Sequence, residues 1–502
     1  MLLKVVNVFA LVIFLISLEN AYGWKLFSKG HRSGGNLIPP HKNVSREQLP
    51  PDQWFDQKLD HFSDNNNELW KQRYFVNDTF YKRGGPVFLM IGGEGEASPI
   101  WMVQGAWIHY ARELNALCFQ VEHRFYGKSR PTKDLSVESL KYLSSEQALA
   151  DLANFIEAIN AKYKLDADVK WIAFGGSYPG SLAAWVREKY PNLIYGSVST
   201  SGPLLAKADF YEYYNVVNAS LATYSEECVT AVQKSIEQVE ILLRHMIGQR
   251  SLNVKFKLCD PIEKSIENIM DISNFFESLA SNFAGVVQYN KDNSPHASLT
   301  IDDVCNVMVN TSIGAQIDRL AEVNTLLLKQ GNQTCLDYKY DKMVKLMQNT
   351  SWDSDEANGE IQWTYQTCNE FGFYQTSDDK QRIFGDRFPL VFFVKQCTDF
   401  YGRDFDADYL FNSINKTNKF YFGLKPNTTN VLYVHGSIDP WHALGLIESD
   451  DPKLPTIYIE GTAHCANMYE PKDSDFPQLK QAREKIREFL RVLISDDSTN
   501  DI

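Results

Sequence analysis

The sequence predicts an α/β fold, in which helices cover a mostly parallel sheet and a helical insertion interrupts the chain. Short apolar runs alternate with helical patterns from about residue 70 to 200. Long helical periodicities replace them over residues 205–425, and apolar runs return after residue 430. Alternating strands and helices are typical of parallel sheets, because the crossover between two parallel strands is usually a helix.

The first predicted strands and the first crossover helix come from residues 86–163. Residues 86–91 (PVFLMI) and 116–121 (ALCFQV) are short apolar runs that end in polar or glycine-rich turns, as buried strands do. Over residues 144–163, apolar side chains recur three or four positions apart on one helix face: Leu149, Leu152, Ile156, Ile159 and Tyr163. Ser144 and Gln147 have the spacing of a capping box at the start of this helix.

A strand, a sharp turn and a helix follow. Residues 169–174 (VKWIAF) predict the strand, residues 175–180 (GGSYPG) the turn, and residues 181–190 a helix that stops at Pro191. Residues 194–199 (IYGSVS) predict one more strand, after which the alternation ends.

Residues 205–425 are predicted to be mostly helical. One apolar stripe has helical spacing: Val229, Val232, Ile236, Val239, Leu243 and Met246. A second stripe is expected to begin with Ile262, Ile266 and Ile269. Strand patterns are scarce in this part of the chain.

The sheet pattern resumes at residues 430–434 (NVLYV) and 456–460 (TIYIE). A closing helix is predicted from the spacing of Leu479, Ala482, Ile486, Phe489 and Leu493. We therefore predict one α/β domain built from residues 24–204 and 426–502, interrupted by a helical cap domain at residues 205–425.

The composition is that of a globular protein, and the amino terminus indicates export. The chain has 502 residues, 44% of them hydrophobic and 23% charged, and a net charge of −13 without a long basic run, which disfavours nucleic acid as a partner. Residues 1–23 resemble a signal peptide, with Lys4 before an apolar stretch and small residues near position 23. No later segment is apolar over the ~18 residues that a membrane span needs, so we expect no span after signal removal.

Cysteines and glycosylation sequons agree with an oxidising, secretory compartment. Six of the eight cysteines lie between residues 228 and 397, which predicts a disulfide-bearing insertion whose connectivity the sequence does not give. For Cys465, both a free thiol and a disulfide remain open. Eight Asn-x-Ser/Thr sequons are candidate glycosylation sites: Asn43, Asn77, Asn218, Asn310, Asn332, Asn349, Asn415 and Asn427.

The turn at residues 175–180 is a candidate nucleophile elbow. In the G-x-S-x-G elbow, a serine sits between a strand and a helix, where its hydroxyl is exposed and the following N–H points to the oxyanion. Gly175 and Ser177 match this pattern, but Pro179 occupies the last small position and Gly180 follows it. We interpret Ser177 as the nucleophile of an acyl-transfer enzyme.

The acid and base partners of such a serine should lie downstream, in the order Ser, Asp or Glu, His. Asp439 follows the strand at residues 430–434, and His464 follows the strand at residues 456–460. Each would therefore lie at a strand end, where the sheet positions its catalytic side chains. We predict that Asp439 orients His464 and that His464 is the base.

The oxyanion hole should combine the N–H of Tyr178 with an N–H from the loop after an early strand. The glycine-rich residues 92–95 occupy that loop, and Gly93 or Glu94 is the expected donor. Phosphate-loop and dinucleotide-binding motifs fail because Glu122 and Ser98 stand where glycines are required. No metal-binding spacing occurs either, so no cofactor is predicted.

Six segments together resemble a family of lysosomal and secreted serine peptidases. The family contains prolyl carboxypeptidase, dipeptidyl peptidase II and thymus-specific serine protease, and the sequence is most similar to the last branch. The segments are EHRFYGKS (122–129), YLSSEQALADL (142–152), GGSYPGSLAAW (175–185), QTCNEFGFYQT (366–376), GSIDPWHALG (436–445) and EGTAHC (460–465).

The resemblance implies an α/β-hydrolase fold with a helical insertion over the active site, and it assigns the same triad of Ser177, Asp439 and His464. It also implies cleavage after proline, with Trp441 in an aromatic substrate pocket. The helical insertion, which lies in sequence between the serine and its partners, predicts an exopeptidase that acts on short peptides or chain ends. Ser181 and Met468 stand where larger pocket residues would be expected, which leaves strict proline preference open. A homodimer and a secreted or lysosomal location are expectations from the resemblance.

Two other functions remain open from the residues alone. The same fold hosts lipases and carboxylesterases, since a fold does not determine its substrate. A catalytically silent glycoprotein that binds other molecules is the second alternative, although an intact Ser, Asp and His set argues against it.

Overall fold

The computed structural model describes residues 37, 39–40, 44–291 and 299–495. The predicted signal peptide at residues 1–23 and the sequon at Asn43 lie outside these described residues. In the described ranges, no helix is both long enough and apolar enough to cross a membrane.

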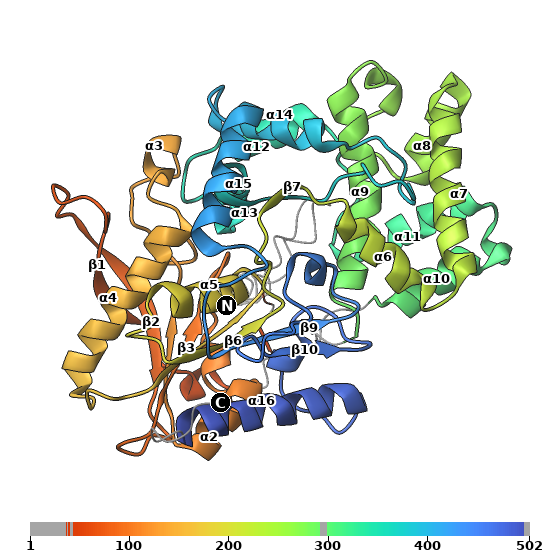
Figure 1. Ribbon diagram of the computed structural model, residues 1–502. Coiled ribbons are helices and arrows are strands. Elements are labelled where there is room, and N and C mark those ends of the chain that lie inside the picture. Colours follow the sequence, from red (N-terminus) through yellow and green to blue (C-terminus); the bar gives the residue numbers. More distant parts are fainter. Residues whose placement is uncertain (1–36, 38, 41–43, 292–298, 496–502) are drawn as a thin grey trace, which may run out of the picture.

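The core of the molecule is an eight-stranded sheet with strand order β1-β2-β4-β3-β5-β6-β9-β10 (Figure 1). Strand β2 pairs antiparallel with β1 and β4, and all other neighbours are parallel. The strands are β1 Gln53–Lys58, β2 Leu69–Asn77, β3 Val87–Ile91, β4 Leu117–Val121, β5 Trp171–Gly176, β6 Gly196–Thr200, β9 Val431–Gly436 and β10 Thr456–Ile459. This sheet, with a tight turn into a helix after β5, has the α/β-hydrolase fold, so the predicted fold class is confirmed.

Helices cover both faces of the sheet. The helices α2 Ala106–Leu114 and α16 Pro477–Ser495 pack on one face, and α4 Ser145–Tyr163 and α5 Tyr178–Lys189 pack on the other. Along β3, Val87 and Leu89 belong to the same apolar cluster as α4 and α5, whereas Phe88 and Met90 pack with α2 and α16. Because both faces are buried, strands β3 and β4 have nearly continuous apolar sequences.

Between β6, which ends at Thr200, and β9, which begins at Val431, the described residues are mostly helical. This part of the chain, called the helical segment below, lies at the top and right of the sheet in Figure 1. Its helices are α6 Glu212–Ala222, α7 Glu226–Leu243, α8 Met246–Lys255, α9 Ile269–Gln288, α10 Ile301–Val309, α11 Gln316–Gln330, α12 Tyr340–Met347, α13 Glu360–Gln366, α14 Leu390–Tyr401 and α15 Ala407–Tyr421. A π-helical turn, Thr367–Phe371, follows α13. Two short strands that the sequence did not reveal, β7 Lys207–Asp209 and β8 Gly372–Tyr374, pair in parallel.

Short helices complete the described chain. They are α3 Val137–Leu140 and the 3₁₀ turns Arg46–Gln48, Pro99–Met102, Ile262–Lys264, Thr311–Ile313, Asp355–Asn358, Pro440–Leu444 and Ala466–Met468.

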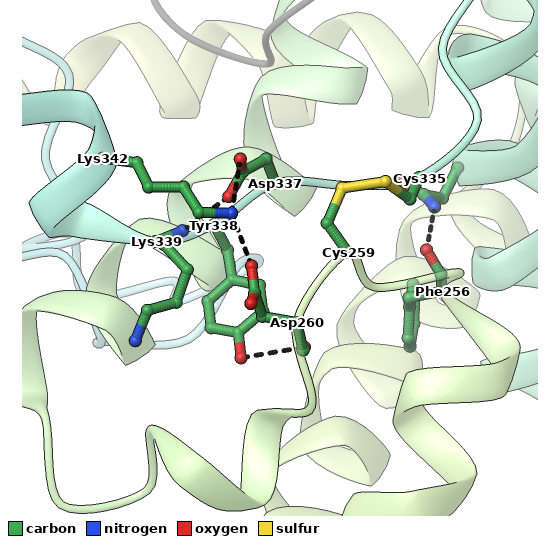
Figure 2. Close-up of a disulfide and its surroundings, with 9 residues drawn as sticks. Phe256, Cys259, Asp260, Cys335, Asp337, Tyr338, Lys339 and Lys342 are labelled. Carbon is green, nitrogen blue, oxygen red and sulfur yellow. Dashed lines mark hydrogen bonds and ion pairs between the residues drawn. A yellow bond between two sulfur atoms is a disulfide. The ribbon is translucent and has the colours of Figure 1, made fainter. Parts of the chain in front are cut away.

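Three disulfides lie within the helical segment, and they pair the six cysteines that the sequence grouped together. They are Cys228–Cys305, Cys259–Cys335 and Cys368–Cys397. Figure 2 shows the second, beside which the Tyr338 hydroxyl donates to the carbonyl of Asp260 at 3.1 Å. Cys118 and Cys465 are buried free thiols, which settles the open question about Cys465.

Some element predictions were wrong in detail. The first apolar stripe ends at Leu243, because Met246 opens a separate helix and is 63% exposed. The second stripe is not continuous, since Ile262 lies in a 3₁₀ turn and Ile269 is an exposed first residue of α9.

The two helices on one face of the sheet, α4 and α5, also differ from the prediction at their amino-terminal ends, although α4 begins directly after Ser144 as predicted. The Ser144 hydroxyl accepts from the N–H of Gln147, but the Gln147 side chain contacts Asp60 and His61, so the capping box is half formed. Helix α5 begins at Tyr178, three residues before the predicted start, because the turn itself supplies the first helical residues.

Candidate active site

Ser177 occupies the turn between β5 and α5 in a strained conformation. Its φ of 67° and ψ of −136° lie where a non-glycine residue is uncommon, which is typical of a functional turn. The N–H of Ser177 donates to the carbonyl of Thr200 at 3.0 Å, and its carbonyl accepts from the N–H of Gly180 at 2.8 Å. These hydrogen bonds to β6 and α5 hold the serine at the sheet edge.

The small residues around Ser177 are required by close contacts of the main chain. A β-carbon on Gly175 would lie 1.9 Å from the carbonyl oxygen of Pro179, and one on Gly180 would lie 2.3 Å from that of Thr200. Gly180 therefore meets the steric requirement that the usual motif places one residue earlier. Pro179 is accommodated because Gly93, which faces its ring, has no side chain.

Asp439 and His464 contact each other at the ends of neighbouring parallel strands, β9 and β10. Nδ1 of His464 lies 2.9 Å from Oδ1 of Asp439, and both side chains are fully buried. The same Asp439 oxygen accepts from the N–H of Trp441 at 3.0 Å. A carboxylate on Nδ1 leaves Nε2 of the imidazole free to act as a base.

The loop that carries His464 packs against the turn that carries Ser177. The N–H of Cys465 donates to Oγ of Ser201 at 3.0 Å, and a β-carbon on Gly176 would lie 2.9 Å from Sγ of Cys465. Between the two described side chains themselves, no hydrogen bond joins Nε2 of His464 to Oγ of Ser177. The structure thus joins Asp439 to His464 directly and places Ser177 beside their loop.

Burial and charge shift the pKa values of Asp439 and His464 in opposite directions. Burial alone would raise the pKa of Asp439, but the imidazole of His464 holds that pKa below its usual value. Burial likewise opposes a charge on His464, but the Asp439 carboxylate and the Cys465 thiol raise its pKa well above the usual value. A reaction that needs neutral His464 should therefore slow as the pH falls.

The predicted oxyanion donors surround the Ser177 turn. Tyr178 is the first residue of α5, where the N–H has no preceding helical carbonyl to bind. The N–H of Gly92 donates to Val121 at 2.8 Å, whereas a β-carbon on Gly93 would lie 2.4 Å from Cγ of Pro179. The main chain at Gly93 is therefore in contact with the nucleophile turn.

Glu94 contributes a buried carboxyl group to the same region. Its side chain is 2% exposed, and its Oε1 has no hydrogen-bond partner among the described residues. Burial raises the pKa of Glu94 to about 8, against an opposing effect of His464. The group is therefore a neutral acid at acidic and neutral pH.

Residues from the end of α9 complete the site, and no sequence pattern pointed to them. The carbonyl of Gln288 accepts from the N–H of His464 at 3.0 Å, and its Oε1 accepts from Nε1 of Trp441 at 3.0 Å. The ring of Tyr289 packs edge-on against His464, with centroids 6.1 Å apart. The second predicted stripe reached only Ile269, at the opposite end of α9, and periodicity does not say which loop a helix end will contact.

Trp441 lies in an aromatic cluster that joins the Asp439 turn to the helical segment. Its side chain is 3% exposed and contacts the rings of Phe210, Tyr213 and Phe373. From Phe373 the contacts continue through Phe371 to Tyr178, the residue after the nucleophile. Aromatic side chains therefore connect the candidate nucleophile and acid residues.

Ser181, a predicted position of the substrate pocket, is fully buried and donates to the carbonyl of Pro203 at 2.7 Å.

Known proteins resemble this chain over most of its length. A Caenorhabditis elegans protein that is named as a serine protease is 38% identical over 473 residues, covering 91% of this chain and 92% of its own. The thymus-specific serine protease of Mus musculus is 34% identical over 459 residues, covering 89% of this chain and 88% of its own. The lysosomal Pro-X carboxypeptidase of Homo sapiens is 28% identical over 431 residues, covering 83% and 82%.

Solved structures give a weaker likeness. The proline iminopeptidase of Mycobacterium smegmatis superposes with a TM-score of 0.40 at 11% identity, covering 88% of this chain and 99% of that chain. The fold assignment therefore rests on the strand order described above. Residues 57–486 match the serine carboxypeptidase S28 family, and with the relatives above this shows that the chain belongs to that family of serine-type hydrolases.

Proposed function

We propose that Ser177, Asp439 and His464 are the catalytic triad of this serine peptidase. The observation that carries the proposal is the buried 2.9 Å contact between Asp439 and His464, at a loop packed on the strained Ser177 turn. A serine, its base and the group that orients the base form the triad arrangement on many unrelated folds.

In the proposed reaction, Oγ of Ser177 attacks the carbonyl carbon of the scissile peptide while Nε2 of His464 takes its proton. The resulting oxyanion accepts hydrogen bonds from the N–H of Tyr178 and from Gly93 or Glu94. His464 then gives the proton to the leaving nitrogen, the C–N bond breaks, and an acyl-enzyme remains. Water, deprotonated by His464, attacks the ester and releases the acid product.

The helical segment supports an exopeptidase that acts on short peptides. It contributes Gln288 and Tyr289 to the surroundings of His464, so the site lies between the sheet edge and the helices. Such a covered site excludes a folded protein chain but admits a peptide end. The aromatic cluster from Tyr178 to Trp441 would suit the compact, apolar ring of proline, and one relative is named a Pro-X carboxypeptidase.

We also infer a secreted or lysosomal location. Disulfides persist in oxidising compartments, and this chain has three. Of the sequons in the described ranges, Asn77 and Asn218 are partly buried and five are exposed and suited to carry glycans: Asn310, Asn332, Asn349, Asn415 and Asn427. A lysosomal relative agrees with this inference.

Labelling with a fluorophosphonate probe, followed by a peptide-library digest, tests the proposal. The wild-type protein should be labelled at Ser177 and should remove residues from peptide ends, with faster cleavage after proline. Ser177→Ala should abolish labelling, and Asp439→Asn and His464→Ala should lower its rate by at least ~10³-fold. Ester hydrolysis without peptide cleavage would instead indicate a carboxylesterase, and an unlabelled wild type would contradict the triad.

A further inference from the structure

Tyr178 is held by its side chain as well as by its position in helix α5. The ring is 1% exposed and packs against Trp363 and Phe371 of the helical segment. Its hydroxyl lies 3.1 Å from Nε2 of His123, in the loop after β4, and 3.1 Å from Nε2 of Gln366, at the end of α13. Two parts of the molecule therefore meet at this one hydroxyl group.

The direction of these hydrogen bonds is determined by His123. Its Nδ1 lies 2.7 Å from the carbonyl of Arg124, which can only accept, so Nδ1 carries the proton. Burial lowers the pKa of His123 to about 4, so the ring is neutral at physiological pH and Nε2 is an acceptor. Tyr178 must therefore donate to His123, and its oxygen must accept from Gln366.

Gln366 is itself fixed by three partners. Its Oε1 accepts from the hydroxyl of Tyr126 at 2.7 Å, and its Nε2 donates to Glu370 at 3.1 Å as well as to Tyr178. Glu370 in turn accepts from the N–H of Ser145 at 2.9 Å, at the start of α4. The amide of Gln366 consequently has one orientation. The two hydrogen bonds then have one possible direction each: Gln366 donates to Tyr178, and Tyr178 donates to His123.

We propose that Gln366 and His123 are positioning residues for the oxyanion hole, because together they anchor the residue whose main-chain N–H follows the nucleophile. This inference rests on the proposed catalytic role of Ser177 and Tyr178. The N–H and the anchored ring of Tyr178 share one α-carbon, so a change in the ring position turns the peptide group that would bind the oxyanion. The helical segment would then contribute to transition-state binding as well as to access.

Two variants remove the anchor in different places. Tyr178→Phe deletes the shared hydroxyl and keeps the ring. Gln366→Met keeps the length of the side chain but deletes the amide that donates to Tyr178 and Glu370 and accepts from Tyr126. Tyr338→Phe is the matched control, because Tyr338 is a fully buried tyrosine whose hydroxyl also donates to a carbonyl, but beside the Cys259–Cys335 disulfide (Figure 2). All three proteins should retain the wild-type circular dichroism spectrum.

We expect Tyr178→Phe and Gln366→Met to lower kcat on a peptide substrate by roughly 10- to 100-fold, with KM changed less than about twofold, since the lost interaction acts in the transition state. The rate of fluorophosphonate labelling should fall by a similar factor, because the probe forms a tetrahedral adduct at Ser177. Tyr338→Phe should remain within about twofold of wild type in both measurements.

Gln366→Glu gives a readout that a purely structural role would not change. A protonated glutamate can still donate to Tyr178, whereas an ionised one can only accept and so reverses the required polarity. The groups that face this position are Tyr126, Tyr178 and Glu370, and burial raises the pKa of Glu370 to about 7. Relative to wild type at each pH, this variant should be more active at pH 5 than at pH 7.5, whereas the deficit of Gln366→Met should not change with pH.

Wild-type labelling rates in both Tyr178→Phe and Gln366→Met would overturn the positioning role while leaving the triad intact. A Gln366→Glu variant with the same relative activity at both pH values would also count against it. Failure of the wild-type protein to react with the probe would instead contradict the proposed function.

Discussion

At the scale of single residues, Gly93 and Pro179 touch where the proposed oxyanion loop meets the nucleophile turn. A β-carbon on Gly93 would lie 2.4 Å from Cγ and 2.6 Å from Cδ of Pro179. The proline ring is rigid, so Gly93→Ala should displace one loop from the other. We expect a loss of kcat of ~10²-fold or more, as removal of an oxyanion donor causes, with a stability cost of about 1–3 kcal/mol.

A second substitution provides the control for Gly93→Ala. Cβ of Pro179 lies 3.9 Å from the new β-carbon, an ordinary contact, so only the distal ring atoms clash. The double variant Gly93→Ala with Pro179→Ala should therefore recover much of the lost kcat, measured with the same peptide substrate. A double variant no better than Gly93→Ala alone would show that the contact does not position the loop.

Glu94 gives a prediction about pH, because its folded pKa of about 8 exceeds its ordinary value of 4.5. Between these two values the folded protein binds more protons than the unfolded chain, so the free energy of unfolding should fall as the pH rises from about 4.5 to 8. Gln mimics the neutral acid and does not titrate. Compared with Glu94→Gln, the wild-type protein should therefore lose stability on going from pH 6 to pH 8, by more than ~1 kcal/mol.

Thermal or urea unfolding at both pH values would measure this difference. An exposed glutamate on α7 supplies the control, since Glu237→Gln should leave the pH dependence of wild type unchanged. Parallel pH dependences for wild type and Glu94→Gln would mean that Glu94 ionises in the folded protein as it does in water. Peptidase activity of Glu94→Gln near pH 6 should stay within a few-fold of wild type, because the neutral acid and the amide have the same shape.

At the scale of elements, the sequence predicted the parts of the sheet that are buried on both faces. Strands β3, β4, β5 and β6 are fully buried, and the first three are mostly apolar runs that end in polar or glycine-rich turns, whereas β6 consists largely of small residues. Strands β1 and β2 were missed, because β1 lies at the sheet edge with mostly exposed or half-buried residues and β2 mixes charged and apolar positions. The paired strands β7 and β8 have only three residues each, too few to form a pattern.

The residues of the candidate site likewise divide into those that the sequence could predict and those that it could not. Ser177, Asp439 and His464 could be proposed from sequence because each follows a predicted strand, and strand ends meet at one sheet edge. Gln288 and Gln366 could not, because they act from helix ends that reach the site only through tertiary packing.

Two charged residues directly after β4, Glu122 and Arg124, also could not be interpreted correctly from the sequence. They looked like a polar turn, but they are buried and paired: Glu122 binds Arg73, and Arg124 binds Asp151 with two nitrogens. A buried ion pair depends on a partner that is distant in sequence, and a single chain does not reveal that partner.

At the scale of the whole molecule, the helical segment and the sheet are joined through the candidate site itself. Gln288 of α9 holds the main chain of His464 and the ring of Trp441, and Gln366 of α13 holds Tyr178. Loosening of the helices should therefore change activity before the sheet unfolds. The disulfides control this loosening, because two of them, Cys228–Cys305 and Cys259–Cys335, close long loops within the helical segment.

Removal of one disulfide tests this connection. The Cys259–Cys335 bridge spans 76 residues, so the variant with Cys259→Ala and Cys335→Ala should lose roughly 4 kcal/mol through the larger entropy of its unfolded chain. The loss should fall on the helical segment, and peptidase activity should disappear at a lower temperature than the circular dichroism signal of the folded chain. Cys118→Ala is the control, since it removes a buried thiol of β4 that forms no disulfide. If activity and circular dichroism were lost together in the double variant, the two parts would unfold as one unit, and the helices would not control the site separately.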